Sequence, residues 1–170
     1  MKVNTKKIII IAMLVAFDVI FSRLLAVNVL IAKVGLGFAA IGVCAMLYGP
    51  AWAGVCAALS DLVGALLFPT GAYFPGFTVT AAMTGVIFGL FLYKQRPKLK
   101  QCFFAALTNC LLITLICNSI MIAVVFGPPL MPLIATRSVE TAVMLAIQTA
   151  VLTAISASDS LYGKIIEIGR

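Results

Sequence analysis

The sequence contains no histidine and little charge: Asp, Glu, Lys and Arg make up only 10% of its 170 residues. Without histidine, and with five cysteines that show no C-x-x-C spacing, it offers almost no ligands for a zinc, haem or iron–sulfur site. No serine or cysteine has a plausible general base beside it, which disfavours an enzyme such as a transferase or protease. A G-x-x-x-x-G-K-S/T phosphate loop is absent, so the sequence shows no sign of driving transport with nucleotide itself. We therefore expect neither catalysis nor a cofactor.

What the sequence does contain is apolar: 64% of its residues are hydrophobic and the mean hydropathy is +1.20. Such a chain cannot present an ordinary wet surface, which predicts an integral membrane protein. Five apolar stretches are separated by breaks, and a sixth follows if residues 34–68 are divided at Gly49-Pro50. Since each crossing needs about 20 helical residues, six helices use nearly the whole chain. We predict an all-α bundle of six transmembrane helices that forms a single domain over residues 1–170.

The net charge of +7 is unevenly placed along these helices. If the amino terminus is inside, the outer segments hold Arg23, Lys33 and Arg137. The inner segments then hold nine basic residues: Lys2, Lys6, Lys7, Lys94, Arg96, Lys98, Lys100, Lys164 and Arg170. Excess Lys and Arg mark the cytoplasmic side, so both termini are predicted to be cytoplasmic. The basic charge does not indicate nucleic acid, because no soluble fold exists to present it.

The predicted helices cover residues 6–27, 38–48, 50–67, 77–93, 103–126 and from about 132 onward. Small residues recur on several of them at four-residue spacing, which lets neighbouring helices approach closely. One seam of small residues along a helix face consists of Ala81, Gly85 and Gly89. The pair Ala12 and Ala16 has the same four-residue spacing. The spacing of that pair does not say whether its partner lies in this chain or in another protein. The five cysteines lie in the same apolar segments and are interpreted as small packing residues.

Three polar side chains are predicted to lie at a similar depth. Counting back from the outer helix ends at 1.5 Å per residue places Asp18, Asp61 and Asn118 roughly 10–13 Å down. Arg23 falls roughly 6 Å down by the same count, and Arg137 lies near the outer mouth. An ionisable group at such depth is costly unless it faces the bundle interior or a polar cavity, so both acids are candidate functional residues. The plainer interpretation is that each acid only bonds backbone groups or a neighbouring helix.

The segment FPTGAYFPGFT, residues 68–78, lies between two apolar helices and carries four aromatic residues without a charge. A loop that only faces water rarely needs Phe68, Tyr73, Phe74 and Phe77 together. We interpret it as the rim and lid of a cavity for a planar ligand; the alternative is an interfacial aromatic belt with a proline turn. Carboxylates below would accept N–H bonds from a heterocycle edge, and arginines above would hold a ligand carboxylate.

The stretch FPTGAYFPGFTVTAAMTGVIFGLFLY, preceded by MLYGPAWAGVCAALSDLVGALL, resembles the folate-specific substrate-binding (S) components of energy-coupling factor vitamin transporters. The resemblance covers most of the chain. It implies a six-helix protein of the bacterial plasma membrane that captures folate from outside without catalysis. It also implies docking through Ala12 and Ala16 onto a transmembrane coupling subunit driven by two cytoplasmic ATPase subunits.

The resemblance further implies that the outer connections after the first, third and fifth helices bind the ligand. On that basis the expected ligand contacts are Arg23, Gly71, Tyr73, Phe74, Phe77 and Arg137, with Phe38 and Asn118 as weaker candidates. Contacts from Asp18 and Asp61 to the pterin ring are inferred from depth, not from the resemblance. Two alternatives stay open: an S component for another flat vitamin such as riboflavin, and a stand-alone proton-coupled carrier that uses the two acids as a relay.

Overall fold

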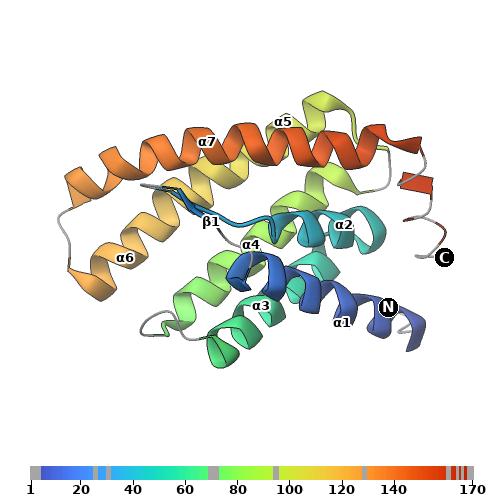
Figure 1. The fold of residues 1–170 in the computed structure, drawn as a ribbon, viewed down its shortest axis with the longest axis horizontal. Helices are drawn as coiled ribbons and strands as arrows, with labels where there is room; N and C mark the ends of the chain where they lie inside the picture. Colours follow the sequence, from blue (N-terminus) through green and yellow to red (C-terminus); the bar gives the residue numbers. More distant parts are fainter. Residues whose placement is uncertain are drawn as a thin grey trace.

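The computed structural model describes residues 5–24, 27–29, 32–68, 73–93, 96–127, 130–159, 162–163, 165 and 167 (Figure 1). Its elements are, in chain order, α1 (Thr5–Val19), the π-helical η1 (Ile20–Leu24), β1 (Val27–Val29), β2 (Ala32–Val34), α2 (Phe38–Tyr48), α3 (Pro50–Leu67), α4 (Pro75–Leu92), α5 (Leu99–Thr108), the π-helical η2 (Asn109–Cys117), α6 (Asn118–Phe126) and α7 (Leu130–Ala157).

The helices lie side by side along one long axis (Figure 1). The first turn of α1 and the last turn of α7 lie at the same end of the bundle, on the right of Figure 1. The end of α3, the start of α4, the end of α6 and the start of α7 lie at the opposite end. The predicted ligand-binding connections after α3 and α6 are therefore at one end, and the predicted cytoplasmic segments are at the other.

Proline and glycine set several helix boundaries. Gly49 has a φ of 81°, in the region that favours glycine, and Pro50 occupies the first turn of α3, where its missing N–H costs nothing. Pro75 begins α4 in the same way, two residues before the predicted start at Phe77. Gly127 ends α6 with a φ of 73°. The predicted ranges 38–48 and 50–67 agree with α2 and α3.

Two local features depart from the all-helical prediction. Residues expected in an irregular outer connection form an antiparallel hairpin, in which Val27 pairs with Val34. β-Branched residues favour such extended backbone. In addition, η1 and η2 interrupt helices that were predicted to be regular. Short π-helical segments are rare, and they occur frequently at functional sites.

The predicted small-residue seam on α4 packs against α3. A Cβ built on Gly85 would lie 2.2 Å from the carbonyl oxygen of Ala53, and one on Gly89 would lie 2.2 Å from Cα of Pro50. These distances leave no room for a side chain, so the two backbones touch. On α3, Gly54 faces Val86 of α4 across the same interface. The close approach fixes α3 and α4 as a rigid pair.

The buried core confirms the interpretation of the cysteines as packing residues. Four of them, Cys44, Cys56, Cys102 and Cys110, are fully buried, whereas Cys117 is half-buried. The largest fully buried side chains are those of Phe88, Leu92 and Leu152. Small thiols and large apolar side chains therefore fill the centre of the bundle together.

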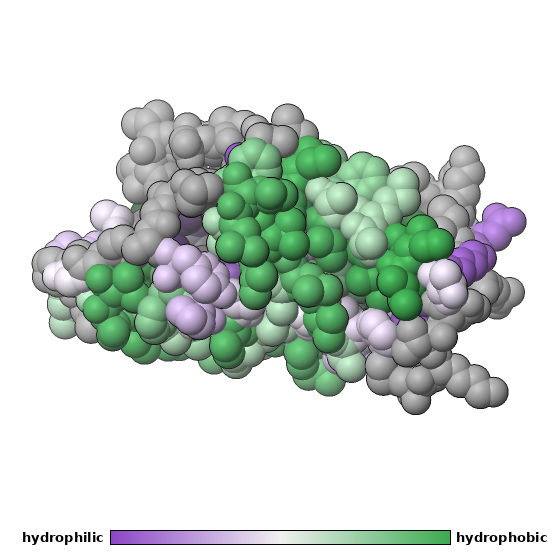
Figure 2. All heavy atoms as spheres, turned by 90° about the horizontal axis from the view of Figure 1, so that it is seen from below, coloured by the Kyte–Doolittle hydropathy of each residue, from purple (hydrophilic) through white to green (hydrophobic). Residues whose placement is uncertain are grey.

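Within the described part of the chain, four helical stretches are long and apolar enough to cross a membrane: residues 50–67, 75–92, 99–125 and 131–157. Helix α2 is apolar but has only 11 residues. Large apolar side chains remain exposed along the bundle, and Figure 2 shows them as a broad hydrophobic region across the middle of one face. Such a surface suits lipid and confirms a multi-pass membrane protein. Six crossings and cytoplasmic termini remain predictions.

The α3–α4 interface predicts the effect of one added methyl group. Because its Cβ would overlap the Ala53 carbonyl, Gly85→Ala should lower the free energy of unfolding by about 1–3 kcal/mol, as overpacking does. Denaturant titration of the purified protein in detergent measures this loss. Gly163→Ala is the matched control, since a Cβ at Gly163 meets nothing within 4 Å. Equal stabilities of the two variants would contradict the packing described.

Candidate functional site

The candidate site is built around an ion pair between η1 and α3. Nη2 of Arg23 lies 3.6 Å from Oδ1 of Asp61, and the two side chains are 17% and 21% exposed. Gly64, one turn further along α3, allows this approach, because a Cβ there would lie 3.1 Å from Nε of Arg23. The sequence count placed the arginine above the acids in a separate layer; the structure brings Arg23 and Asp61 into direct contact.

A chain of hydroxyl groups links the same acid to the aromatic segment. Oγ1 of Thr78, in the first turn of α4, donates to Oδ2 of Asp61 at 2.8 Å. The hydroxyl of Tyr73 and Oγ1 of Thr78 form a hydrogen bond of 2.9 Å. Tyr73 is half exposed, so it connects the solvent-facing side of the site to the buried acid.

Asp18 lies deeper and belongs to the same group. Its side chain is buried, and it is close enough to interact electrostatically with Asp61 and Arg23, with Ser60 also beside it. A Cβ built on Gly37 would lie 2.0 Å from Oδ1 of Asp18. Helix α1 therefore reaches the start of α2 because residue 37 is glycine. Asp18 and Asp61 therefore lie near each other, and their contact with a ligand stays a prediction.

The aromatic side chains of the connection between α3 and α4 are only partly buried. The rings of Phe74 and Phe77 meet edge to face with centroids 6.2 Å apart. Gly76 lies between the ring of Phe74 and the sulfur of Met121 on α6. Phe68 is 37% exposed. The ring of Phe74 thus lies near α6, while Phe68 and Tyr73 keep exposed surface.

A second polar contact joins α4 to the start of α6. Oγ1 of Thr80 donates to Oδ1 of Asn118 at 2.9 Å and also lies 2.9 Å from the carbonyl oxygen of Phe77. Asn118 directly follows η2. Asn118 thus has its partner within the bundle, a threonine that the sequence analysis did not single out.

Arg137 lies on α7 and pairs with a residue of its own helix. Its Nε is 3.7 Å from Oε2 of Glu140, beyond hydrogen-bond distance, and both side chains are less than one-fifth exposed. Nε and Nη1 of Arg137 are buried without a hydrogen-bond partner among the described residues. Buried N–H groups of a charged side chain usually have hydrogen-bond partners. The guanidinium of Arg137 is therefore suited to donate hydrogen bonds to an anionic group.

The remaining predicted residues lie in other surroundings. Phe38 is 7% exposed and belongs to the hydrophobic core. Ala12 and Ala16 are exposed on α1, as a docking face requires. Gly71 lies outside the described residues.

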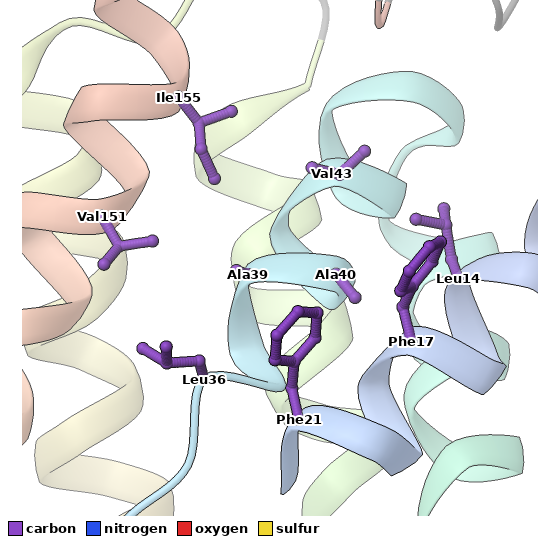
Figure 3. A pocket seen from close by; sticks show the side chains of 9 residues that line it. All are labelled: Leu14, Phe17, Phe21, Leu36, Ala39, Ala40, Val43, Val151 and Ile155. Carbon is purple, nitrogen blue, oxygen red and sulfur yellow. The ribbon is translucent and has the colours of Figure 1, made fainter. Parts of the chain in front are cut away.

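An apolar hollow of about 270 Å³ opens elsewhere, between α1, α2 and α7 (Figure 3). None of the predicted ligand contacts lines it. The polar group around Arg23 and the apolar hollow are therefore two distinct features of the bundle.

Sequence analysis missed Thr78 and Thr80. Each donates a hydrogen bond to a residue that it did single out, Thr78 to Asp61 and Thr80 to Asn118. Asp61 and Thr78 are 17 positions apart, so helical periodicity could not connect them. Their signal was the presence of hydroxyl residues in the first turns of a helix that directly follows the aromatic segment.

The Arg23–Asp61 contact predicts a measurable coupling energy. In a double-mutant cycle of Arg23→Met and Asp61→Leu, unfolding free energies should be non-additive by about 0.5–3 kcal/mol, because each single change leaves a half-buried charge behind. The pair Arg96 and Asp159 provides the comparison. Its side chains are 46% and 88% exposed, so the coupling should be below about 1 kcal/mol. Additivity at Arg23 and Asp61 would contradict an interacting pair.

Comparisons with known proteins identify relatives of this chain. A family model described as the substrate-specific component of ECF transporters matches residues 6–158. The folate transporter FolT of Clostridium novyi (strain NT) is 34% identical over 151 residues, which cover 89% of this chain and 87% of that protein. FolT of Leuconostoc mesenteroides subsp. mesenteroides is 37% identical over 95 residues, covering 55% of this chain and 50% of that protein.

The fold is also similar to a crystal structure of FolT bound with folic acid. The TM-score is 0.81 at 33% sequence identity, and the match covers 89% of this chain and 92% of the other. Sequence and fold therefore agree over nearly the same length. On these matches the chain belongs to the family of substrate-specific components of ECF transporters, which are membrane transport proteins and not enzymes.

Proposed function

We propose that this protein captures folate at the outer face of a bacterial plasma membrane, as the substrate-binding subunit of an ECF transporter. The observation that carries the proposal is the match to FolT bound with folic acid, at 33% identity over 89% of the chain. A sequence identity of 33% over most of the chain indicates a closer relationship than a shared fold alone. The chain would act as a single domain with six membrane crossings and cytoplasmic termini, as its charge asymmetry favours.

The polar group around Asp61 is suited to the hydrogen-bonding edge of a pterin. A carboxylate accepts paired N–H bonds from such an edge, and Asp61 already accepts a hydrogen bond from Thr78. Arg23 offsets the charge of this acid within the bundle. Asp18 and Asn118 lie on neighbouring elements, so we assign them supporting contacts to the same end of the ligand.

The other end of folate is anionic, and we assign it to Arg137. The buried Nε and Nη1 of this residue lack hydrogen-bond partners among the described residues, which leaves two donors for a carboxylate. Between the two ends, Tyr73, Phe74 and Phe77 supply aromatic surface for the planar part of the ligand. Gly71 and Phe38 are further proposed contacts, from the resemblance alone.

Transport would need partners. The chain has no nucleotide-binding motif, so we propose that a transmembrane coupling subunit and two cytoplasmic ATPase subunits supply the energy. The exposed Ala12 and Ala16 on α1 form the proposed docking face, because small residues at this spacing let a second helix approach closely. A stand-alone proton-coupled carrier would need no such face.

Calorimetric titration of the purified protein with folate, riboflavin and 6-hydroxymethylpterin tests the proposed substrate. Folate should bind most tightly and riboflavin should not compete. Arg137→Gln should weaken folate by about 10–100-fold, since hydrogen bonds to charged groups contribute about 1.5–3 kcal/mol, and should hardly change the pterin, which lacks the glutamate. Arg96→Gln at the opposite end is the control and should leave both affinities unchanged. Equal losses for both ligands at Arg137 would argue against a carboxylate contact.

The docking face has its own test. Ala16→Trp should leave folate affinity within about twofold of the wild type but abolish folate uptake and co-purification of a coupling subunit, because the bulky ring prevents close helix approach. Uptake is measured in cells that also express the partner subunits. Ala150→Trp, an exposed alanine of α7, is the matched control and should transport normally. Loss of folate binding in Ala16→Trp would mean that this face packs inside the bundle.

A further inference from the structure

The apolar hollow between α1, α2 and α7 plays no part in the site described above. Leu14 and Phe17 of α1, with Phe21 of η1, form one wall, and α7 contributes Val151 and Ile155 to the other (Figure 3). The floor between them consists of Ala39, Ala40 and Val43 of α2 and of Leu36, two residues before α2. All nine lining residues are apolar, so the hollow offers no hydrogen bond to a polar ligand.

A charged residue lies along the same stripe of α1. Lys7 and Leu14 are seven residues apart in α1, which places them on one face of the helix and roughly 10 Å apart along its axis. The ammonium of Lys7 lies 4.6 Å from the ring centre of Tyr48 and 4.3 Å from that of Trp52. The cation is thus held beyond the hollow, towards the end where α1 begins.

Two further donors lie at this end. The hydroxyl of Tyr48 and Nε1 of Trp52 have no hydrogen-bond partner among the described residues. Lysine with tyrosine and tryptophan is the combination found where membrane helices meet lipid headgroups. An apolar hollow with such a group further along the same face of α1 matches a molecule with a hydrocarbon chain and an anionic head.

We propose that the hollow holds one acyl chain of an anionic phospholipid whose phosphate lies at Lys7. The lipid belongs to the leaflet on the side of the amino terminus, because its chain runs from Lys7 past Leu14 towards Phe21. The inference rests on the membrane-spanning fold and not on the identity of the transported substrate.

A transmembrane helix of a partner protein fits this hollow less well. The proposed docking face lies on another flank of α1, since Ala12 and Phe17 are five residues and therefore about 140° apart. A single hydrocarbon chain is thin enough to enter.

Native mass spectrometry of the detergent-purified protein with dioleoyl-phosphatidylglycerol and dioleoyl-phosphatidylcholine tests the proposal. We expect one phosphatidylglycerol to remain bound under collisional activation, with a several-fold preference over phosphatidylcholine. A basic residue near the membrane surface contributes about 1 kcal/mol to anionic-lipid binding, which corresponds to roughly fivefold. Val43→Trp, which fills the hollow, should reduce the one-lipid species at least fivefold. Lys7→Gln should remove the preference but keep some bound lipid.

The matched controls separate this site from ordinary lipid contact. Val55→Trp places the same ring on an exposed position of α3 and should not reduce binding. Lys6→Gln removes the neighbouring charge and should change the preference by less than twofold. Val151→Trp fills the hollow from α7 and replaces Val43→Trp if that variant does not fold, as judged by thermal unfolding. Equal lipid binding by Val43→Trp and Val55→Trp, or no preference for phosphatidylglycerol in the wild type, would overturn the proposal.

Discussion

The arrangement of this protein depends on how polar groups are satisfied inside an apolar bundle. A charged side chain at membrane depth has little water to solvate it and must find its partner in the chain. Arg23 and Asp61 meet for this reason, and Thr78 and Tyr73 extend the contact towards the surface. The same requirement joins Thr80 to Asn118. Polar residues of four different helical elements are thereby drawn towards one end of the molecule.

Glycine makes this possible by letting elements approach without side chains between them. Gly64 leaves space for Arg23 to lie across α3, and Gly37 lets the carboxylate of Asp18 reach the start of α2. Gly85 and Gly89 bring α4 into close contact with α3 in the same way. The polar contacts and the close packing therefore support each other. Gly37 and Gly64 leave room for polar side chains, and Gly85 and Gly89 hold α4, which carries Thr78 and Thr80, close to α3.

Much of this could be predicted from the sequence because its signals are local. Proline and glycine set the ends of α2 and α3, and four-residue spacing identified the face of α4 that packs on α3. Depth counting brought Asp18 and Asp61 towards one region. The Asp61–Thr78 bond could not be found this way, because it joins residues on different helices. Nor could the π-helical η1, which breaks the 3.6-residue period just where Arg23 lies.

The two arginines of the candidate site differ in a way that bears on the proposed ligand. Arg23 is held between Asp61 and the backbone at Gly64, so its charge is already offset within the bundle. Arg137 forms a comparable ion pair with Glu140, at 3.7 Å against 3.6 Å for Arg23 and Asp61, but its Nε and Nη1 are buried without hydrogen-bond partners among the described residues. A carboxylate at Arg137 would supply the hydrogen bonds that these two donors lack. In the proposed function the glutamate of folate is therefore assigned to α7, and Asp61 is assigned the N–H bonds of the ring.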